Sequence, residues 1–79
     1  MTRKVATYMA HRYYYNRNSN KNNKHEIHRQ GCAYMPKEKN KMKIGLADDC
    51  HKAIIKAKER TGIEKFDGCA YCCSECNEA

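Results

Sequence analysis

Hydrophobic residues alternate with polar or small residues along positions 41–46, where the apolar side chains are Met42, Ile44 and Leu46. A period of two predicts a half-buried strand there. Residues 1–15 are rich in strand-forming residues and end in three tyrosines, whose alternation with polar neighbours fits one buried face. Residues 25–32 form a further short extended piece that runs into a glycine turn. These segments predict a short antiparallel sheet.

One helix is predicted, over about residues 48–61. Its apolar stripe follows the i, i+3, i+4, i+7 spacing of a helix face and consists of Cys50, Ala53, Ile54 and Ala57. Either Asp48 or Asp49 can cap its first turn. Gly62 is well placed to end it.

The remaining segments are polar or rich in cysteine. Residues 16–24 carry no apolar side chain and are predicted to form a loop, whereas residues 69–76 form a cysteine-rich tail. We see no internal repeat. The prediction is one small α+β domain over residues 1–79, with a basic arm at 1–12 and a zinc-stapled unit at 13–77.

The chain has little material for a hydrophobic core. Leu, Ile, Val and Phe together number eight among 79 residues, about a tenth of the chain. A highly charged chain with less than roughly a fifth of these residues tends to stay disordered. Either the protein is disordered or a covalent or coordinate link holds it, and the six cysteines are the candidates.

The choice between metal and disulfides depends on the compartment. The N-terminus has no apolar run typical of a secretory signal, and no segment approaches the ~20 apolar residues of a membrane span. We therefore expect a cytoplasmic, reduced protein that contacts no membrane. In such a compartment, clustered cysteine and histidine favour one zinc ion over disulfides.

The predicted zinc ligands come in two close pairs, since zinc prefers four tetrahedral nitrogen and sulfur ligands. The first pair is His28 and Cys32. The second comes from the tail, where we favour Cys72 and Cys76. Cys69 and Cys73 are alternates in that tail, paired as Cys69 with Cys72 or as Cys73 with Cys76.

Two other cysteine and histidine features receive different interpretations. Cys50 lies on the apolar helix stripe, which favours a buried hydrophobic role, and Cys50 with Cys69 is the disulfide or buried pair to expect on oxidation. His25 and His28 resemble a metalloprotease motif, but they are i, i+3 in an extended stretch, whereas that motif needs i, i+4 on a helix. We expect no enzymatic activity and no small-molecule substrate, and His11 and His51 are taken as surface residues.

The order of these motifs resembles a group of small uncharacterised bacterial proteins over roughly residues 13–77. The motifs are those of residues 25–32, Asn40–Gly45, Cys50–Ala53 and Gly68–Cys76. The layout is also remotely similar to the zinc domain of Ada-type DNA methylphosphotriester repair proteins, whose pattern is Cys-x3-Cys, a strand, a helix and Gly-x3-Cys-x2-Cys. Gly68 and Cys72 match it, and Cys76 lies one residue too far along.

This resemblance implies a zinc fold but argues against methyl transfer. In the Ada-type family the first ligand is the cysteine that accepts the methyl group, and here that position is His28. A zinc-bound imidazole is not an equivalent nucleophile.

Charge is unevenly distributed along the chain. The net charge of +7 divides into +9 (eleven basic, two acidic) over residues 1–43 and −2 (five basic, seven acidic) over residues 44–79. The basic half indicates a module that binds nucleic acid, or alternatively one that docks on or inhibits an acidic protein. The contact residues expected are Arg3, Lys4, Arg12, Tyr13, Arg17, Lys21 and Lys24, with Tyr14 and Tyr15 also able to stack on bases.

Overall fold

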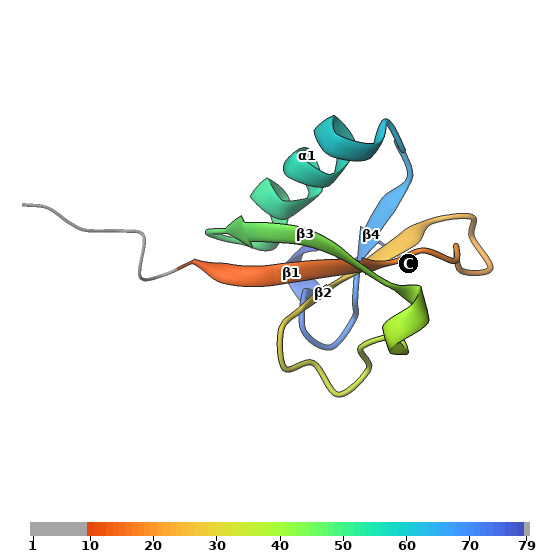
Figure 1. Ribbon diagram of the computed structural model, residues 1–79, viewed down its shortest axis with the longest axis horizontal. Coiled ribbons are helices and arrows are strands. Elements are labelled where there is room, and N and C mark those ends of the chain that lie inside the picture. The colour runs from red at the N-terminus through yellow and green to blue at the C-terminus, as the bar shows by residue number, and fades with distance from the viewer. Residues whose placement is uncertain (1–9, 79) are drawn as a thin grey trace, which may run out of the picture.

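The computed structural model describes residues 10–78 and combines a four-stranded mixed sheet with one α-helix (Figure 1). The elements in order are β1 (His11–Asn16), β2 (His25–Arg29), η2 (Glu38–Asn40), β3 (Lys41–Ala47), α1 (Cys50–Thr61), β4 (Phe66–Gly68) and η3 (Ser74–Cys76). The sheet order is β3-β1-β2-β4. The predicted α+β class and main helix are confirmed.

The sheet is not antiparallel throughout. β1 pairs antiparallel with β2 and with β3, but β4 pairs parallel with β2. The chain leaves β2, passes through β3 and α1, and returns along the far edge in the direction of β2. A three-residue strand after a helix is too short to show a period of two, so no pattern in the sequence indicates this parallel pair.

Strand β1 supplies aromatic side chains to the core. Tyr13 and Tyr15 are buried, whereas Tyr14 between them points to the other face and is half-buried. Tyr15 lies opposite Ile27 of β2 and meets the ring of Phe66 edge to face, with ring centres 5.4 Å apart. Tyr13 and Tyr15 thus fill part of the core that Leu, Ile and Val side chains would fill in a protein of ordinary composition.

A bulge in β3 interrupts the alternation expected there. Tyr13 lies opposite Gly45 and Tyr14 opposite Lys43, so Ile44 is an extra residue on β3. Gly45 has φ of 117°, a conformation that glycine adopts readily and that suits a bulge. The predicted strand is confirmed, but the side-chain alternation between the two faces of the sheet is shifted at the bulge. Ile44 and Ala47 are buried, while Leu46 is half exposed.

Helix α1 has the caps and the buried stripe that its sequence indicates. Asp49 is the N-cap and its side chain accepts the Lys52 N–H at 2.9 Å. Gly62 ends the helix in the left-handed conformation at φ of 77°. Cys50, Ala53 and Ala57 are buried with Ile54 packed beside them. This small-residue face lies on the sheet next to Tyr13, Tyr15 and Ile27.

Two cations of α1 cover the outer strand. Lys56 Nζ donates to the carbonyl oxygen of Leu46 at 2.6 Å, and Arg60 donates to that of Ile44 at 2.9 Å. Both carbonyls belong to β3, which lies at an edge of the sheet.

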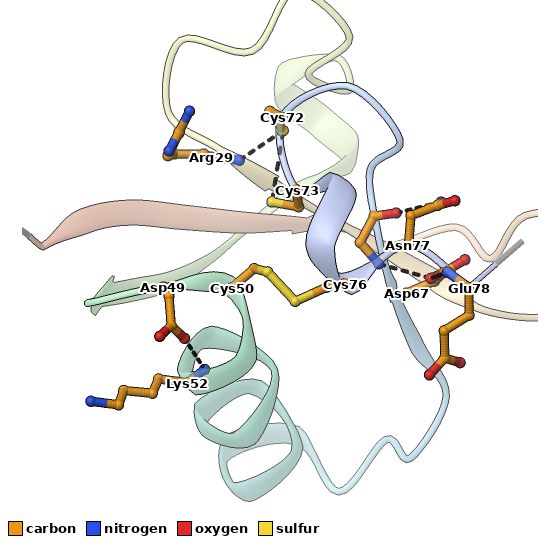
Figure 2. The surroundings of a disulfide bond; sticks show 11 residues. Arg29, Asp49, Cys50, Lys52, Asp67, Cys72, Cys73, Cys76, Asn77 and Glu78 are labelled. Atoms are coloured by element: carbon orange, nitrogen blue, oxygen red, sulfur yellow. Dashed lines mark hydrogen bonds between the residues drawn. A yellow bond between two sulfur atoms is a disulfide. The ribbon is translucent and has the colours of Figure 1, made fainter.

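A disulfide joins the start of the helix to the tail (Figure 2). It links Cys50 with Cys76, whose Cα atoms lie 6.4 Å apart, and closes a loop with a sequence separation of 26. The predicted pairing of Cys50 with Cys69 is therefore wrong, because Cys69 directly follows β4, whereas η3 brings Cys76 back to the first turn of α1. Chain-entropy estimates put the stabilisation from such a loop at about 3.5 kcal/mol.

Hydrogen bonds fix the tail to β4 at several points. The buried carboxylate of Asp67 accepts the N–H groups of Gly68 and Glu78 at 2.9 and 2.8 Å through Oδ1. Asn77 Nδ2 donates to the carbonyl oxygen of Gly68 at 2.8 Å. Gly68 itself needs to lack a side chain, since a Cβ there would lie 2.7 Å from Cys76 Cβ. Within residues 10–78 no helix has the length and apolar character to cross a membrane.

The adjacent aspartates before α1 provide a matched stability test. Asp49→Ala should lower the free energy of unfolding by about 1 kcal/mol, because it leaves first-turn amide groups without their acceptor. Asp48→Ala removes only an exposed ion pair with Lys52 and should cost less than about 0.5 kcal/mol. Chemical denaturation of both variants measures the difference, and equal effects would contradict the assignment of Asp49 as the cap.

Candidate metal centre

Parallel pairing of β2 with β4 brings two cysteine turns together. Ile27 lies opposite Gly68 in that pair, and each strand leads within a few residues into a turn that carries cysteine. Parallel strands end at the same edge, so the turn after β2, with Cys32, meets the turn after β4, with Cys69 and Cys72. The bond from the Cys69 N–H to the carbonyl oxygen of Ile27, 2.9 Å, continues this pairing.

His28 joins the same cluster from within the sheet. It follows Ile27, so its side chain points to the face opposite the helix. His28 is nevertheless only 2% exposed, because the turns that carry the cysteines cover that face of the sheet. His25 points to the other face from His28 and packs against Tyr15 and Phe66, with Nδ1 2.9 Å from the carbonyl oxygen of Asn16.

The four side chains form a compact cluster of potential ligands. One ligand atom from each of His28, Cys32, Cys69 and Cys72 lies within 4.8 Å of all the others. Cys32 Sγ and Cys69 Sγ are 3.9 Å apart. A tetrahedral ion with bonds of about 2.3 Å to sulfur holds its ligands roughly 3.8 Å apart. The four side chains could therefore hold a metal ion.

The structure corrects the favoured tail ligands. Cys72 is in the cluster as predicted, but its partner is the alternate Cys69, and Cys76 is bound in the disulfide. The reason is the chain path, since residues 69–72 stay beside β2 and η3 then carries Cys76 to the helix (Figure 2). The sequence predicts zinc in place of disulfides, whereas the structure has a disulfide and a separate cluster of unbridged thiols.

Cys73, the other alternate, lies outside the four-residue cluster. It is fully buried among the core residues, with Sγ 3.8 Å from Cys72 Sγ. Burial raises the pKa of its thiol. Cys73 is therefore a packing residue next to the cluster.

Backbone amide groups donate to the sulfur atom of every cysteine in the cluster. Tyr34 N–H donates to Cys32 Sγ and Tyr71 N–H to Cys69 Sγ, each at 3.4 Å. Arg29 N–H donates to Cys72 Sγ at 3.2 Å (Figure 2). Such hydrogen bonds favour thiolate over thiol. Backbone N–H donors of this kind are expected around thiolate sulfur atoms that bind a cation.

The two turns share a tetrapeptide, which corrects the expectation that the chain has no internal repeat. Gly-Cys-Ala-Tyr occurs at residues 31–34 and again at 68–71. In both copies the tyrosine N–H bonds back to the cysteine two residues before it. Glycine is required for a different reason at each position. Gly31 has a positive φ of 91°, whereas a Cβ at Gly68 would collide with neighbouring atoms. A search for repeated tetrapeptides would have indicated Cys69, not Cys76, as the counterpart of Cys32.

His28 is placed as a neutral imidazole. Burial lowers its pKa, and this effect is partly opposed by Glu26. Nε2 lies 3.7 Å from Glu26 Oε1, whereas Nδ1 is buried and has no hydrogen-bond partner among residues 10–78. A buried nitrogen atom without a hydrogen-bond partner lowers the free energy of unfolding. A metal ion bound by a ring nitrogen would give the buried imidazole a partner, and a carboxylate near the ring is usual for metal-bound histidine.

The surroundings of Cys72 oppose ionisation of its thiol. Burial raises the pKa of Cys72 strongly, and the neighbouring thiol groups raise it further, although the Arg29 N–H lowers it. A divalent ion reverses this balance because it displaces thiol protons and neutralises the thiolates.

A stacked pair of tyrosines connects the two turns. The rings of Tyr34 and Tyr71 have centres 4.1 Å apart and planes inclined by 18°. The residues are 57% and 70% exposed, so the rings gain from contact with each other more than from burial. Each follows its cysteine by two positions, so the stack holds the two cysteine turns side by side.

The expected partner-contact residues are only partly accessible. Tyr13 and Tyr15 are buried, so their assignment to base stacking is wrong, because β1 directs them into the core. Arg12, Arg17 and Lys21 are exposed. Lys24 is paired with Glu78 at 3.3 Å. Tyr14 is half-buried, with Lys41 Nζ 4.9 Å above its ring. Arg3 and Lys4 lie outside the described residues.

No family model, curated protein or solved structure matches this chain. The likeness to the Ada-type zinc domain therefore stays a prediction from motif spacing. The assignment of the cluster rests on its geometry.

The tyrosine stack is open to a double-mutant cycle. Tyr34→Ala and Tyr71→Ala should each destabilise the folded protein, and their coupling free energy should be about 0.5–1.5 kcal/mol, the range for aromatic pairs. Thermal or chemical denaturation of the two single variants and the double variant gives this value. Tyr14→Ala combined with Tyr71→Ala is the control and should be additive, and additive effects for Tyr34 with Tyr71 would show that the stack contributes nothing.

Proposed function

We propose that this protein is a small zinc-binding module that holds one ion through His28, Cys32, Cys69 and Cys72. The observation that carries the proposal is the buried His28 ring, whose Nδ1 has no hydrogen-bond partner among residues 10–78 and which has a ring nitrogen within 4.8 Å of three sulfur atoms. Each of these sulfur atoms accepts a backbone N–H. Neutral imidazole with three amide-bonded sulfur atoms is a donor set suited to Zn²⁺.

The ion would cross-link the turn after β2 to the turn after β4. Four protein ligands close the coordination sphere, which is typical of structural zinc sites and not of catalytic sites that keep a position for water. The site therefore supports a binding module and not an enzyme. The free energy of metal binding would add to that of folding, and this suits a chain with so few large aliphatic residues.

The resemblance to the Ada-type zinc domain supports the proposal in part. With Cys69 and Cys72 as the second pair, the spacing is Cys-x2-Cys, as in that family. The residue four positions before Cys69 is Lys65, where the family pattern has glycine. His28 occupies the place of the methyl-accepting cysteine, so the proposal includes zinc but excludes methyl transfer.

Single substitutions at the cluster should separate ligands from their neighbours. His28→Gln, Cys32→Ser, Cys69→Ser and Cys72→Ser should each lose zinc, because three ligands of this set hold the ion far more weakly. Cys73→Ser is the matched control, since Cys73 is 3.8 Å from a ligand sulfur but outside the cluster. Native mass spectrometry of freshly purified protein counts the ions. Metal-free protein that stays folded with excess chelator would refute the proposal.

A second candidate function is binding of single-stranded nucleic acid. It is supported by the exposed rings of Tyr34 and Tyr71 and by the exposed cations Arg12, Arg17 and Lys21. Aromatic faces stack on bases of any sequence and cations neutralise phosphates. This assignment moves base stacking from β1 to the tyrosines of the cysteine turns.

Fluorescence anisotropy with a labelled single-stranded oligonucleotide at two salt concentrations tests this function. Tyr71→Ala should weaken binding by about 1–3 kcal/mol, and Lys21→Ala should reduce the salt slope by about 1. Lys65→Ala, from the acidic half of the chain, is the control. Absence of salt-sensitive binding, together with a pull-down of an acidic protein that survives nuclease, would replace nucleic acid with a protein partner.

A further inference from the structure

We infer that Cys50, His51 and Cys76 form a second metal site, which becomes available when the Cys50–Cys76 disulfide is reduced. One ligand atom from each of the three residues lies within 4.8 Å of the others. This site is separate from the His28 cluster and shares no residue with it, so it does not depend on the proposed function.

The helix positions two of the three ligands. Cys50 is the first residue of α1 and His51 the second, directly after the N-cap Asp49. Cys50 is buried against the sheet, whereas His51 is exposed. The two side chains leave the helix in different directions, yet a ring nitrogen of His51 lies within 4.8 Å of the sulfur atoms of Cys50 and Cys76. An ion at this place would have solvent on its imidazole side.

The third ligand comes from the tail. Cys76 closes η3, and its N–H donates to the carbonyl oxygen of Cys73 at 3.0 Å. The Asn77 side chain donates to the carbonyl oxygen of Gly68 and the Glu78 N–H donates to Asp67, each at 2.8 Å, which fixes the residues after Cys76 to β4. These bonds do not involve the disulfide, so Cys76 keeps its place beside the helix after the S–S bond is cut.

Charge around the three residues favours a cation. Asp48 and Asp49 precede Cys50, and Glu75 precedes Cys76. The basic side chain in this stretch is Lys52, which is engaged with Asp48 at 3.2 Å. The first turn of a helix also favours negative charge on a sulfur atom through its free amide groups.

The redox step determines when the site exists. In the disulfide each sulfur is bonded to the other and carries no exchangeable proton. A dithiol reductant donates two electrons and two protons, breaks the S–S bond and is itself converted to a disulfide, which leaves two protein thiols. A thiophilic divalent ion such as Zn²⁺ then replaces the two thiol protons, which pass to solvent.

The resulting site differs from the His28 cluster in its chemistry. Two thiolates and one imidazole leave a fourth position open to water or an outside ligand, whereas the His28 cluster supplies four protein ligands. Oxidation would re-form the disulfide and release the ion. The chain would therefore take up one more metal ion in the reduced state than in the oxidised state.

Native mass spectrometry of the full chain, titrated with Zn²⁺ before and after treatment with a phosphine reductant, tests the inference. We expect one additional Zn²⁺ in the reduced protein. The same difference of one is expected for His28→Gln, which disables the first cluster, so failure of the proposed function would leave this readout intact. An equal number of ions in the two redox states would overturn the inference.

Substitution of the exposed histidine gives the ligand-specific control. His51→Ala should weaken binding of the additional ion by at least about tenfold, because it removes a ligand, and should not disturb folding. His11→Ala is the matched control, since His11 is also an exposed histidine but lies on β1. Cys50→Ser should abolish the difference between the redox states. Unchanged affinity in His51→Ala would refute the site as described.

Discussion

The parallel pairing of β2 with β4 is the contact on which the functional part of the molecule depends. Residues 25–27 and 66–68 are far apart in the chain, and only three residues of each strand pair. This short ladder places Cys32, Cys69 and Cys72 at one edge of the sheet, beside His28. The tail bonds of Asp67 and Asn77 then hold the second turn in place. Without this pairing, the potential ligands would be separate.

The sulfur chemistry is divided between the two faces of the sheet. The cluster around His28 lies on the face away from the helix, and the Cys50–Cys76 disulfide joins the helix to the tail on the other side. The tail contributes cysteines to both faces, because Cys69 and Cys72 lie in the cluster whereas Cys76 reaches the helix. The six cysteines therefore have three different structural roles. Three gather with His28, two form the disulfide, and Cys73 fills the space between.

The parts of the fold that follow from local pattern were predictable. The stripe at Cys50, Ala53 and Ala57, the cap choice of Asp48 or Asp49 and the end at Gly62 defined α1 closely. The alternation in residues 41–46 defined β3, but not its bulge, because the extra residue at Ile44 depends on pairing with β1. Three of the four residues of the cluster were in the favoured ligand set. His28, Cys32 and Cys72 were named, whereas the roles of Cys69 and Cys76 depend on the parallel pairing and the path of η3, which leave no period in the sequence.

The hydrogen bonds from Lys56 and Arg60 to β3 have a consequence for how copies of this protein meet. An exposed edge strand is a template on which a second chain can add its own strand and start a growing stack. Here two carbonyl groups of the longer edge are already occupied by cations anchored on α1. The opposite edge, β4, is only three residues long. A small domain with little aliphatic core is thus protected from polymerising through its sheet by two flexible, charged side chains.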